Sequence, residues 1–185
     1  MKKSITCLFL LLHVAASIAQ YTDSTVRNQY GRNHSIALEL SLPIAAFASS
    51  HFIGAGLEYS WADRRYGINA EPRKTLGFTF HGGASYFLGK KTNVAGNDFR
   101  FGGYTYLHAL AGAIVNPYAR TNISLTAGPA VSIYKGNSDF GAAVKLCGSY
   151  YVRNSISIGP AVMYRKHSRV ESLWSIMLRG AFVFP

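Results

Sequence analysis

The stretch NISLTAGPAVSIY, residues 122–134, decides the fold class of this chain. Its large apolar side chains fall on every second residue, which is the period of a β-strand. One face carries Ile123, Leu125, Ala127, Val131 and Ile133. The other face carries Ser124, Thr126 and Gly128. The pattern predicts a strand with one apolar face and one face of small residues.

The same alternation recurs on both sides of this stretch. The eight predicted strands cover residues 35–44, 51–62, 75–88, 103–115, 122–134, 140–152, 155–164 and 173–184. Segments rich in Gly, Asn, Asp and Lys separate them, which is typical of turns. These features predict an all-β fold, an eight-stranded antiparallel up-and-down β-barrel.

Segment 103–115 and two internal prolines depart from the simple strand pattern. In segment 103–115 both faces are similar, and we favour an outward set that turns His108 inward. That outward set is Leu107, Ala109, Ala111, Ala113 and Val115. Pro129 and Pro160 lie inside predicted strands, where proline removes a ladder donor. We expect a bulge or kink at each of them.

Length and composition limit the class of protein. The chain has 185 residues, which predicts one domain. Its net charge is +11, but charged residues make up only 15% and aromatic residues 14%. This composition excludes a disordered chain. No segment after the first 20 residues is apolar for about 18 positions, which excludes a helical membrane protein.

The N-terminus has the features of an export signal. Lys2 and Lys3 precede an apolar segment, residues 5–16, and small residues follow at 17–19. We therefore predict a signal peptide at 1–19, a flexible lead at 20–33 and a barrel domain at 34–185. Removal of the signal leaves Cys147 as the only cysteine, so an internal disulfide is excluded.

The composition of the second face indicates whether the apolar face of the barrel is buried in a core or exposed to lipid. Water-facing strands of soluble proteins are rich in charged residues, whereas here that face carries mainly Gly, Ser and Thr. Aromatic residues gather near the strand ends, where membrane barrels carry their girdles. They are Tyr59, Trp61, Tyr86, Tyr134, Tyr164, Trp174, Phe182 and Phe184. We therefore predict a transmembrane barrel in the outer membrane; a secreted soluble barrel that binds an apolar ligand is the alternative.

An even number of strands places both chain ends on the same side, which we take as the periplasmic side. The periplasmic turns are then 63–74, 116–121 and 153–154. The outer loops are 45–50, 89–102, 135–139 and 165–172. The connection 63–74 is long for a periplasmic turn.

The chain resembles the small outer-membrane β-barrel proteins of Gram-negative bacteria, the PorT-like or OmpA-barrel-like group. The matching segments are LSLPI at 40–44, IGAGLEY at 53–59, GGASYFLG at 82–89 and the aromatic last strand. The resemblance implies insertion by the outer-membrane assembly machinery, which reads a terminal aromatic residue. Here Pro185 follows Phe184, which departs from that terminal pattern.

Only four charged residues lie within the predicted strands, and all four lie on the small-residue face. They are Glu39, Glu58, Lys145 and Arg179. Unpaired buried charges are costly, so we expect a salt-bridge network that fills the lumen. An ion gate or binding site is the alternative. The interior of an eight-stranded barrel is only wide enough for side chains, which argues against a diffusion pore.

The predicted outer loops are basic. Segment 89–102 carries Lys90, Lys91 and Arg100, and segment 165–172 carries Arg165, Lys166 and Arg169. Such loops attract the phosphates of an anionic outer-leaflet lipid, although a generic solvated loop explains them equally well. The basic residues are spread over separate loops, so nucleic-acid binding is not supported.

The segment HSRVE, residues 167–171, superficially resembles the catalytic residues of barrel enzymes that deacylate lipid A. That pattern is His-x-Ser, which places both side chains on one face of a strand. His167 and Ser168 are adjacent and would point in opposite directions. We therefore predict a structural or surface-interaction protein with no catalytic residue, metal or cofactor, and keep a lipid A-modifying enzyme as the alternative.

Overall fold

The computed structural model describes residues 32–66, 73–94, 97–168 and 172–184. The predicted signal peptide, most of the predicted lead, Arg169 and Pro185 lie outside the described residues. Within the described part of the chain, no helix is long and apolar enough to cross a membrane.

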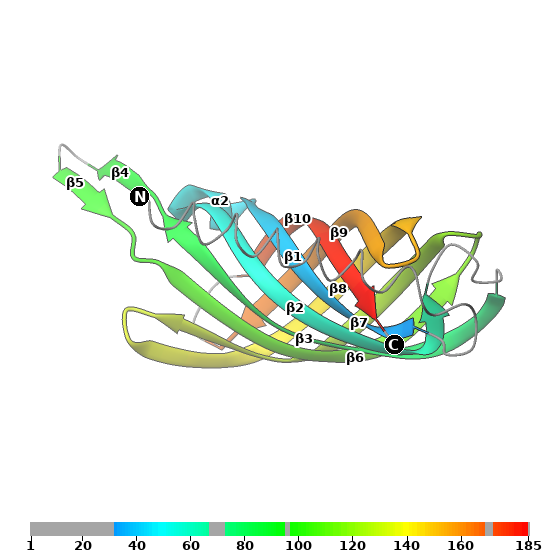
Figure 1. Cartoon of the computed structure of the whole chain (residues 1–185). Helices are drawn as coiled ribbons and strands as arrows, with labels where there is room; N and C mark the ends of the chain where they lie inside the picture. Colours follow the sequence, from blue (N-terminus) through cyan, green and yellow to red (C-terminus); the bar gives the residue numbers. More distant parts are fainter. Residues whose placement is uncertain (1–31, 67–72, 95–96, 169–171, 185) are drawn as a thin grey trace.

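Eight strands form a closed antiparallel barrel (Figure 1). They are β1 (Arg32–Ile44), β2 (His51–Tyr66), β3 (Arg73–Gly89), β6 (Tyr104–Asn116), β7 (Thr121–Tyr134), β8 (Asn137–Arg153), β9 (Ile156–His167) and β10 (Leu173–Phe184). Each strand pairs with its neighbours along the chain, and β10 closes the ring against β1. The predicted eight-stranded, up-and-down architecture is confirmed.

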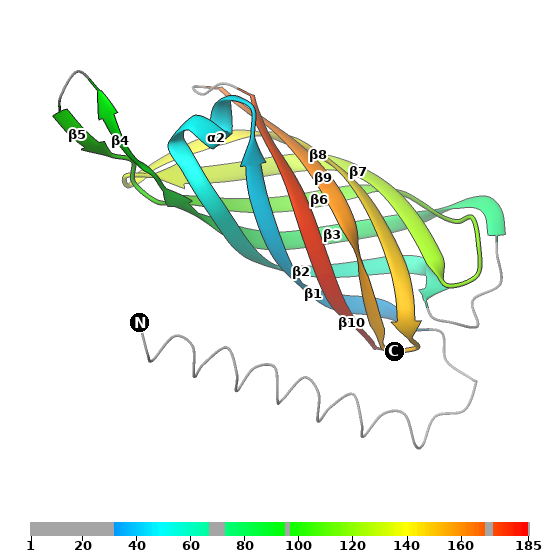
Figure 2. The same ribbon diagram turned by 90° about the horizontal axis from the view of Figure 1, so that it is seen from above.

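One end of the barrel carries Phe184, the last described residue of β10; we call it the terminal end. The opposite end, here called the loop end, carries the short helix α2 (Ala46–Ser50) and a hairpin of β4 (Lys91–Val94) and β5 (Asn97–Arg100). Figure 2 shows this hairpin projecting beyond the barrel wall. The loops predicted at 45–50 and 89–102 therefore contain regular structure.

Other connections are shorter than predicted because the strands are longer. β2 and β3 leave only residues 67–72 between them, which accounts for the long 63–74 connection. The predicted loop 135–139 is a tight turn of Lys135 and Gly136, both with positive φ. Positive φ at both central residues is the geometry of a hairpin turn whose twist matches that of the strands.

The expected bulges at the two prolines are absent from the register. Pairing of β7 with β6 runs from His108 opposite Ala130 to Ala111 opposite Ala127 with no shift across Pro129. The register of β10 against β9 is likewise continuous through Pro160. Each proline follows a glycine whose added Cβ would lie 2.0–2.2 Å from a carbonyl oxygen of the adjacent strand. Glycine before each proline thus lets the adjacent strand approach closely, and neither proline adds a residue to the ladder.

The two faces of the barrel have opposite polarity. Large apolar side chains cover the outside: Leu38, Leu40, Leu57, Phe78, Phe80, Leu125, Leu146, Ile176 and Leu178 are among those that are at least one-third exposed. The inside is lined by charged and polar side chains that are almost fully buried. On β6 the favoured orientation is confirmed, because Leu107, Ala109 and Ala111 are exposed whereas His108 is buried.

Candidate functional site in the barrel lumen

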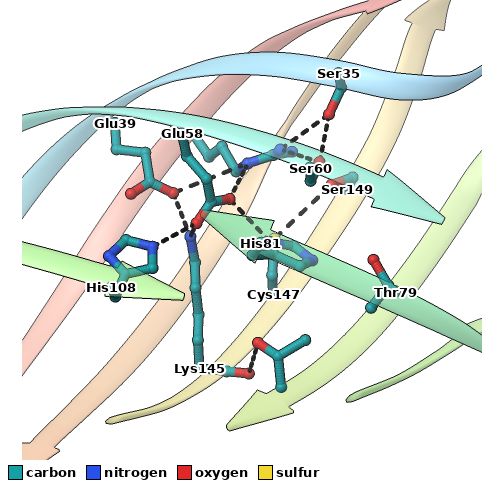
Figure 3. Close-up of polar contacts among 12 residues, drawn as sticks. Ser35, Glu39, Glu58, Ser60, Thr79, His81, His108, Lys145, Cys147 and Ser149 are labelled. Atoms are coloured by element: carbon teal, nitrogen blue, oxygen red, sulfur yellow. Dashed lines mark hydrogen bonds and ion pairs between the residues drawn. The ribbon is translucent and has the colours of Figure 1, made fainter. Parts of the chain in front are cut away.

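The charged residues of the strands meet at one level inside the barrel. Glu39 on β1 lies between outward-facing Leu38 and Leu40, so its side chain points inward. Arg179 on β10 lies directly opposite Glu39 across the β1–β10 ladder. Lys145 on β8 reaches toward the same point from the far wall (Figure 3).

Glu58 on β2 is the centre of this lumen cluster. Its carboxylate accepts a hydrogen bond from Lys145 Nζ at 2.5 Å and forms an ion pair with Arg179 Nε at 3.3 Å. It also contacts His81 Nδ1 at 2.9 Å and His108 Nε2 at 3.1 Å. Because an ionised carboxylate only accepts, both imidazoles donate an N–H to it.

Glu39 shares the same two cations. Lys145 Nζ donates to Glu39 Oε1, and Arg179 Nε lies 3.9 Å from that oxygen. Arg179 Nη2 also donates to Ser35 Oγ at 3.2 Å and to Ser60 Oγ at 3.1 Å, which fixes the guanidinium toward the terminal end. Two carboxylates and two cations balance, so the lumen cluster is neutral when its histidines are neutral.

A glycine makes room for one of the histidines. Gly83 on β3 lies opposite both Glu58 and His108 in the ladders on its two sides. A Cβ at Gly83 would lie 2.8 Å from His108 Cε1 and 3.0 Å from His108 Nε2. Glycine at this position therefore allows the imidazole to reach the carboxylate.

A small polar cavity adjoins the lumen cluster on its terminal side. It is lined by Ser35, Ser60, His81, Ile114, Asn122, Ser124, Cys147, Ser149, Tyr151 and Arg179. Its volume of about 10 Å³ is about the space that one water molecule needs. The lumen is thus filled by side chains at the level of the cluster, with room for little besides water beside it.

Arg165 does not lie where the sequence analysis placed it. The prediction of an outer-loop residue is wrong, because β9 continues three residues beyond the predicted strand and Arg165 points into the lumen, 0% exposed. Its Nη1 donates to Ser175 Oγ at 2.9 Å. Its guanidinium carbon lies 4.4 Å from the ring centre of Tyr106 and 5.1 Å from that of Phe87. Lipid phosphate cannot reach a side chain so enclosed.

Aromatic rings close the loop end of the lumen above Arg165. Phe47 of α2 is buried and packs edge-on against Phe87 and Tyr104, with centroids at 4.9 and 5.5 Å. Lys90 holds this cap in place, because its Nζ donates to the Ala48 carbonyl. Lys90, one of the predicted phosphate contacts, is thus engaged with the backbone of α2.

Three of the other basic residues predicted to contact lipid phosphates, Lys91, Arg100 and Lys166, are exposed at the loop end. Lys91 and Arg100 lie opposite each other in the β4–β5 hairpin. Lys166 faces outward from β9, between two inward residues. Lys135, in the neighbouring turn, lies 5.4 Å from the ring centre of Phe99 in the same hairpin. The hairpin and its surroundings form a basic surface.

The arrangement around His167 and Ser168 differs from a catalytic pair. The His167 side chain is buried in the lumen, whereas Ser168 is exposed on the other face. Ser168 Oγ donates to Asp139 Oδ1 at 2.5 Å. Neither ring nitrogen of His167 has a hydrogen-bond partner among the described residues. The histidine therefore does not activate this serine.

His81 was not predicted to be a site residue, although the sequence carries a signal for its inward orientation. Phe78 and Phe80 face outward on β3, so strict alternation turns His81 inward. His108 was turned inward but was given no role. Both histidines become contacts of Glu58 only through the register of three adjacent strands, which alternation alone does not specify.

No protein-family model matches the sequence, and no curated protein sequence matches it significantly. The barrel is similar to Ail, the attachment invasion locus protein of Yersinia pestis, in a phospholipid bilayer nanodisc: TM-score 0.55, 14% identity, covering 83% of this chain and 99% of that chain. For Ail of Yersinia pestis in complex with the heparin analogue sucrose octasulfate, the TM-score is 0.55 and the identity 11%, and the match covers 84% of this chain and 100% of that chain. For the outer membrane enzyme PagL, the TM-score is 0.50 and the identity 11%, and the match covers 80% of this chain and 98% of that chain. At these identities the similarity concerns the fold alone: this chain has the fold of the small eight-stranded outer-membrane β-barrels.

Proposed function

We propose that this protein is an integral outer-membrane β-barrel with a filled lumen and a structural or surface-interaction role. The observation that carries the proposal is the reversed polarity of the wall: Leu40 and Leu178, paired across β1 and β10, are more than half exposed, whereas Glu39 and Arg179 beside them are buried. Such a surface is stable in lipid and would aggregate in water. Export by the N-terminal signal and insertion by the outer-membrane assembly machinery belong to the same proposal.

The filled lumen argues against passage of solutes. Lys145, Glu39 and Glu58 block the barrel at mid-height, and Phe47 caps its loop end. A general diffusion pore would need a wider barrel. The remaining features that can contact a partner are those of the exposed loop end.

The loop end supports a surface that binds anionic groups. In the proposed orientation the terminal end faces the periplasm and the β4–β5 hairpin faces outward. Lys91, Arg100 and Lys166 then lie where the phosphates of the outer leaflet are found, together with Lys135. Ail, which has a similar fold, was solved in complex with the heparin analogue sucrose octasulfate, and we propose an anionic ligand here on the basic residues of this chain. Arg169, which lies outside the described residues, belongs to the proposal as well.

Membrane location is tested by fractionation and by electrophoresis of unboiled and boiled samples. We expect the protein in the outer-membrane fraction, with a mobility that changes on heating, because closed barrels have no free strand edge at which detergent unfolding begins. Recovery of a folded protein from the soluble periplasmic fraction would contradict the proposal and favour a carrier of apolar ligands.

The surface role is tested by native mass spectrometry of the purified barrel with an anionic phospholipid. The triple variant Lys91→Gln, Arg100→Gln, Lys166→Gln is expected to retain fewer bound lipids than the wild type. A control that removes two positive charges at the terminal end, Arg120→Gln with Arg153→Gln, is expected to behave like the wild type. Loss in proportion to the number of charges removed in the two variants would show that only net charge matters. An unchanged lipid A acylation pattern in a His167→Ala variant would exclude the enzymatic alternative.

A further inference from the structure

The buried charges of the lumen do not balance. Among the described residues, the buried charged side chains besides histidine are Glu39, Glu58, Lys145, Arg165 and Arg179. Two carboxylates neutralise Lys145 and Arg179 in the lumen cluster, and Arg165 remains. Arginine does not lose its proton in proteins. Protonation of any lumen histidine would only add to the positive excess.

No carboxylate compensates Arg165 directly. Among the described residues it forms no ion pair, and the Glu39 carboxylate is already shared between Lys145 and Arg179. Asp139 is only partly buried and accepts the hydroxyl of Ser168. The rings of Tyr106 and Phe87 supply cation–π attraction. This attraction is weaker than the desolvation penalty of a buried cation without a counter-charge.

Several buried polar atoms at and around Arg165 have no hydrogen-bond partner among the described residues. Its Nε and Nη2 have no hydrogen-bond partner among the described residues, and both atoms are buried. The Tyr106 hydroxyl lies beside the guanidinium and has no hydrogen bond of good geometry. His167, whose ring lies 5.9 Å from that of Tyr106, has two further unpartnered nitrogens. Native proteins rarely leave so many buried polar atoms unsatisfied at one place.

We propose that the loop-end half of the lumen binds a small monovalent anion, a halide such as chloride, between Arg165, Tyr106 and His167. The guanidinium supplies charge and two free donor atoms, and the hydroxyl and the imidazole each supply an N–H or O–H donor. The cap formed by Phe47 and Tyr104 makes the site inaccessible to lipid headgroups, which restricts the ligand to a small ion. Among the described residues, Glu39 Oε2 is the one buried carboxylate oxygen without a hydrogen-bond partner. The inference rests on the lumen and is independent of the proposed role of the loop end.

Anomalous diffraction from crystals of the wild-type protein grown in sodium bromide tests the site directly. We expect a bromide peak in hydrogen-bond contact with the Arg165 guanidinium. Bromide found only at exposed lysines, or a water in its place that links Arg165 to Glu39 Oε2, would overturn the proposal. This measurement needs no variant and does not depend on how well a variant folds.

Thermal unfolding provides the solution test. In wild-type protein we expect a midpoint that rises saturably with sodium chloride and does not rise with sodium gluconate at equal ionic strength, because a ligand stabilises the state that binds it. Arg165→Met is expected to lose the halide-dependent rise, and Tyr106→Phe to require more halide for the same rise. The matched control Lys166→Met, one residue away on the outer face, is expected to keep it. An equal halide response in Arg165→Met and the wild type would refute the site.

Discussion

Replacing Lys145 by methionine tests whether the lumen cluster holds the barrel together. The ammonium donates to both Glu39 and Glu58, and it is fully buried. Without it, Arg179 alone faces two carboxylates, and the lumen cluster carries one unpaired negative charge. Breaking a buried ion pair by removing one partner costs about 3–5 kcal/mol. That is a large share of a typical folding free energy of about 5–15 kcal/mol.

The assay is urea unfolding of the barrel in lipid vesicles, followed by tryptophan fluorescence. We expect Lys145→Met to raise the unfolding equilibrium constant roughly a hundredfold to a few thousandfold, since about 1.4 kcal/mol is a factor of ten. The control Lys166→Met makes the same chemical change on an exposed side chain of β9. It is expected to alter the free energy of unfolding by less than about 1 kcal/mol.

A second substitution separates charge imbalance from lost packing. Combining Lys145→Met with Glu39→Gln restores neutrality within the lumen cluster, because Arg179 then balances Glu58 at 3.3 Å. Residues in one ion-pair network are not additive, so the double variant is expected to be more stable than Lys145→Met alone. The reasoning is refuted if Lys145→Met costs less than about 1 kcal/mol, or if the double variant loses the sum of both single losses.

Three further predictions concern the wall and the lumen. Gly83→Ala is expected to lower the free energy of unfolding by about 1–3 kcal/mol, because the added methyl group overlaps His108. The control Gly180→Ala has open space around it and is expected to change little; equal effects of the two variants in urea titrations would contradict this. Leu178→Arg is expected to cost about 2–4 kcal/mol in bilayers, because it places a charge on the lipid-facing side midway along β10; a neutral result would argue against membrane insertion at this level. Cys147 is buried and forms no disulfide, so it is expected to resist maleimide in the folded barrel and to react after denaturation. A Ser168→Cys variant is expected to react in the folded state at its exposed position. Rapid labelling of Cys147 in the folded wild type would show that water and reagent enter the lumen.

Much of the barrel could be predicted because membrane-type strands obey strict alternation. One face meets apolar surroundings and the other a narrow lumen, so a side chain's parity fixes its direction. Alternation turned Glu39 inward, and closure of an eight-stranded ring brought β10, with Arg179, beside it. The distances within the cluster depend on register, which the pattern of one strand does not contain.

The errors fall where strands end. Arg165 continues the inward series of β9, but it follows the last large apolar residue of the predicted strand and was therefore assigned to a loop. Helix α2 has no capping hydrogen bond from a side chain, so nothing in its sequence marks its start. Its position depends on Phe47, which finds a buried place only after the barrel has formed a mouth to cover.

The lumen cluster also constrains the order of events during biogenesis. Lys145 and Glu39 are 106 positions apart in the chain, and Arg179 and Ser35 are 144 positions apart. Contacts of such sequence separation form late, because the intervening loop must first be closed. An incomplete sheet that lacks β8 and β10 therefore exposes two carboxylates without their cations. Such an intermediate is penalised in a bilayer, and the penalty disappears only when the first and last strands meet. We therefore expect the cluster to make insertion cooperative, because its charges are paired only in the finished ring.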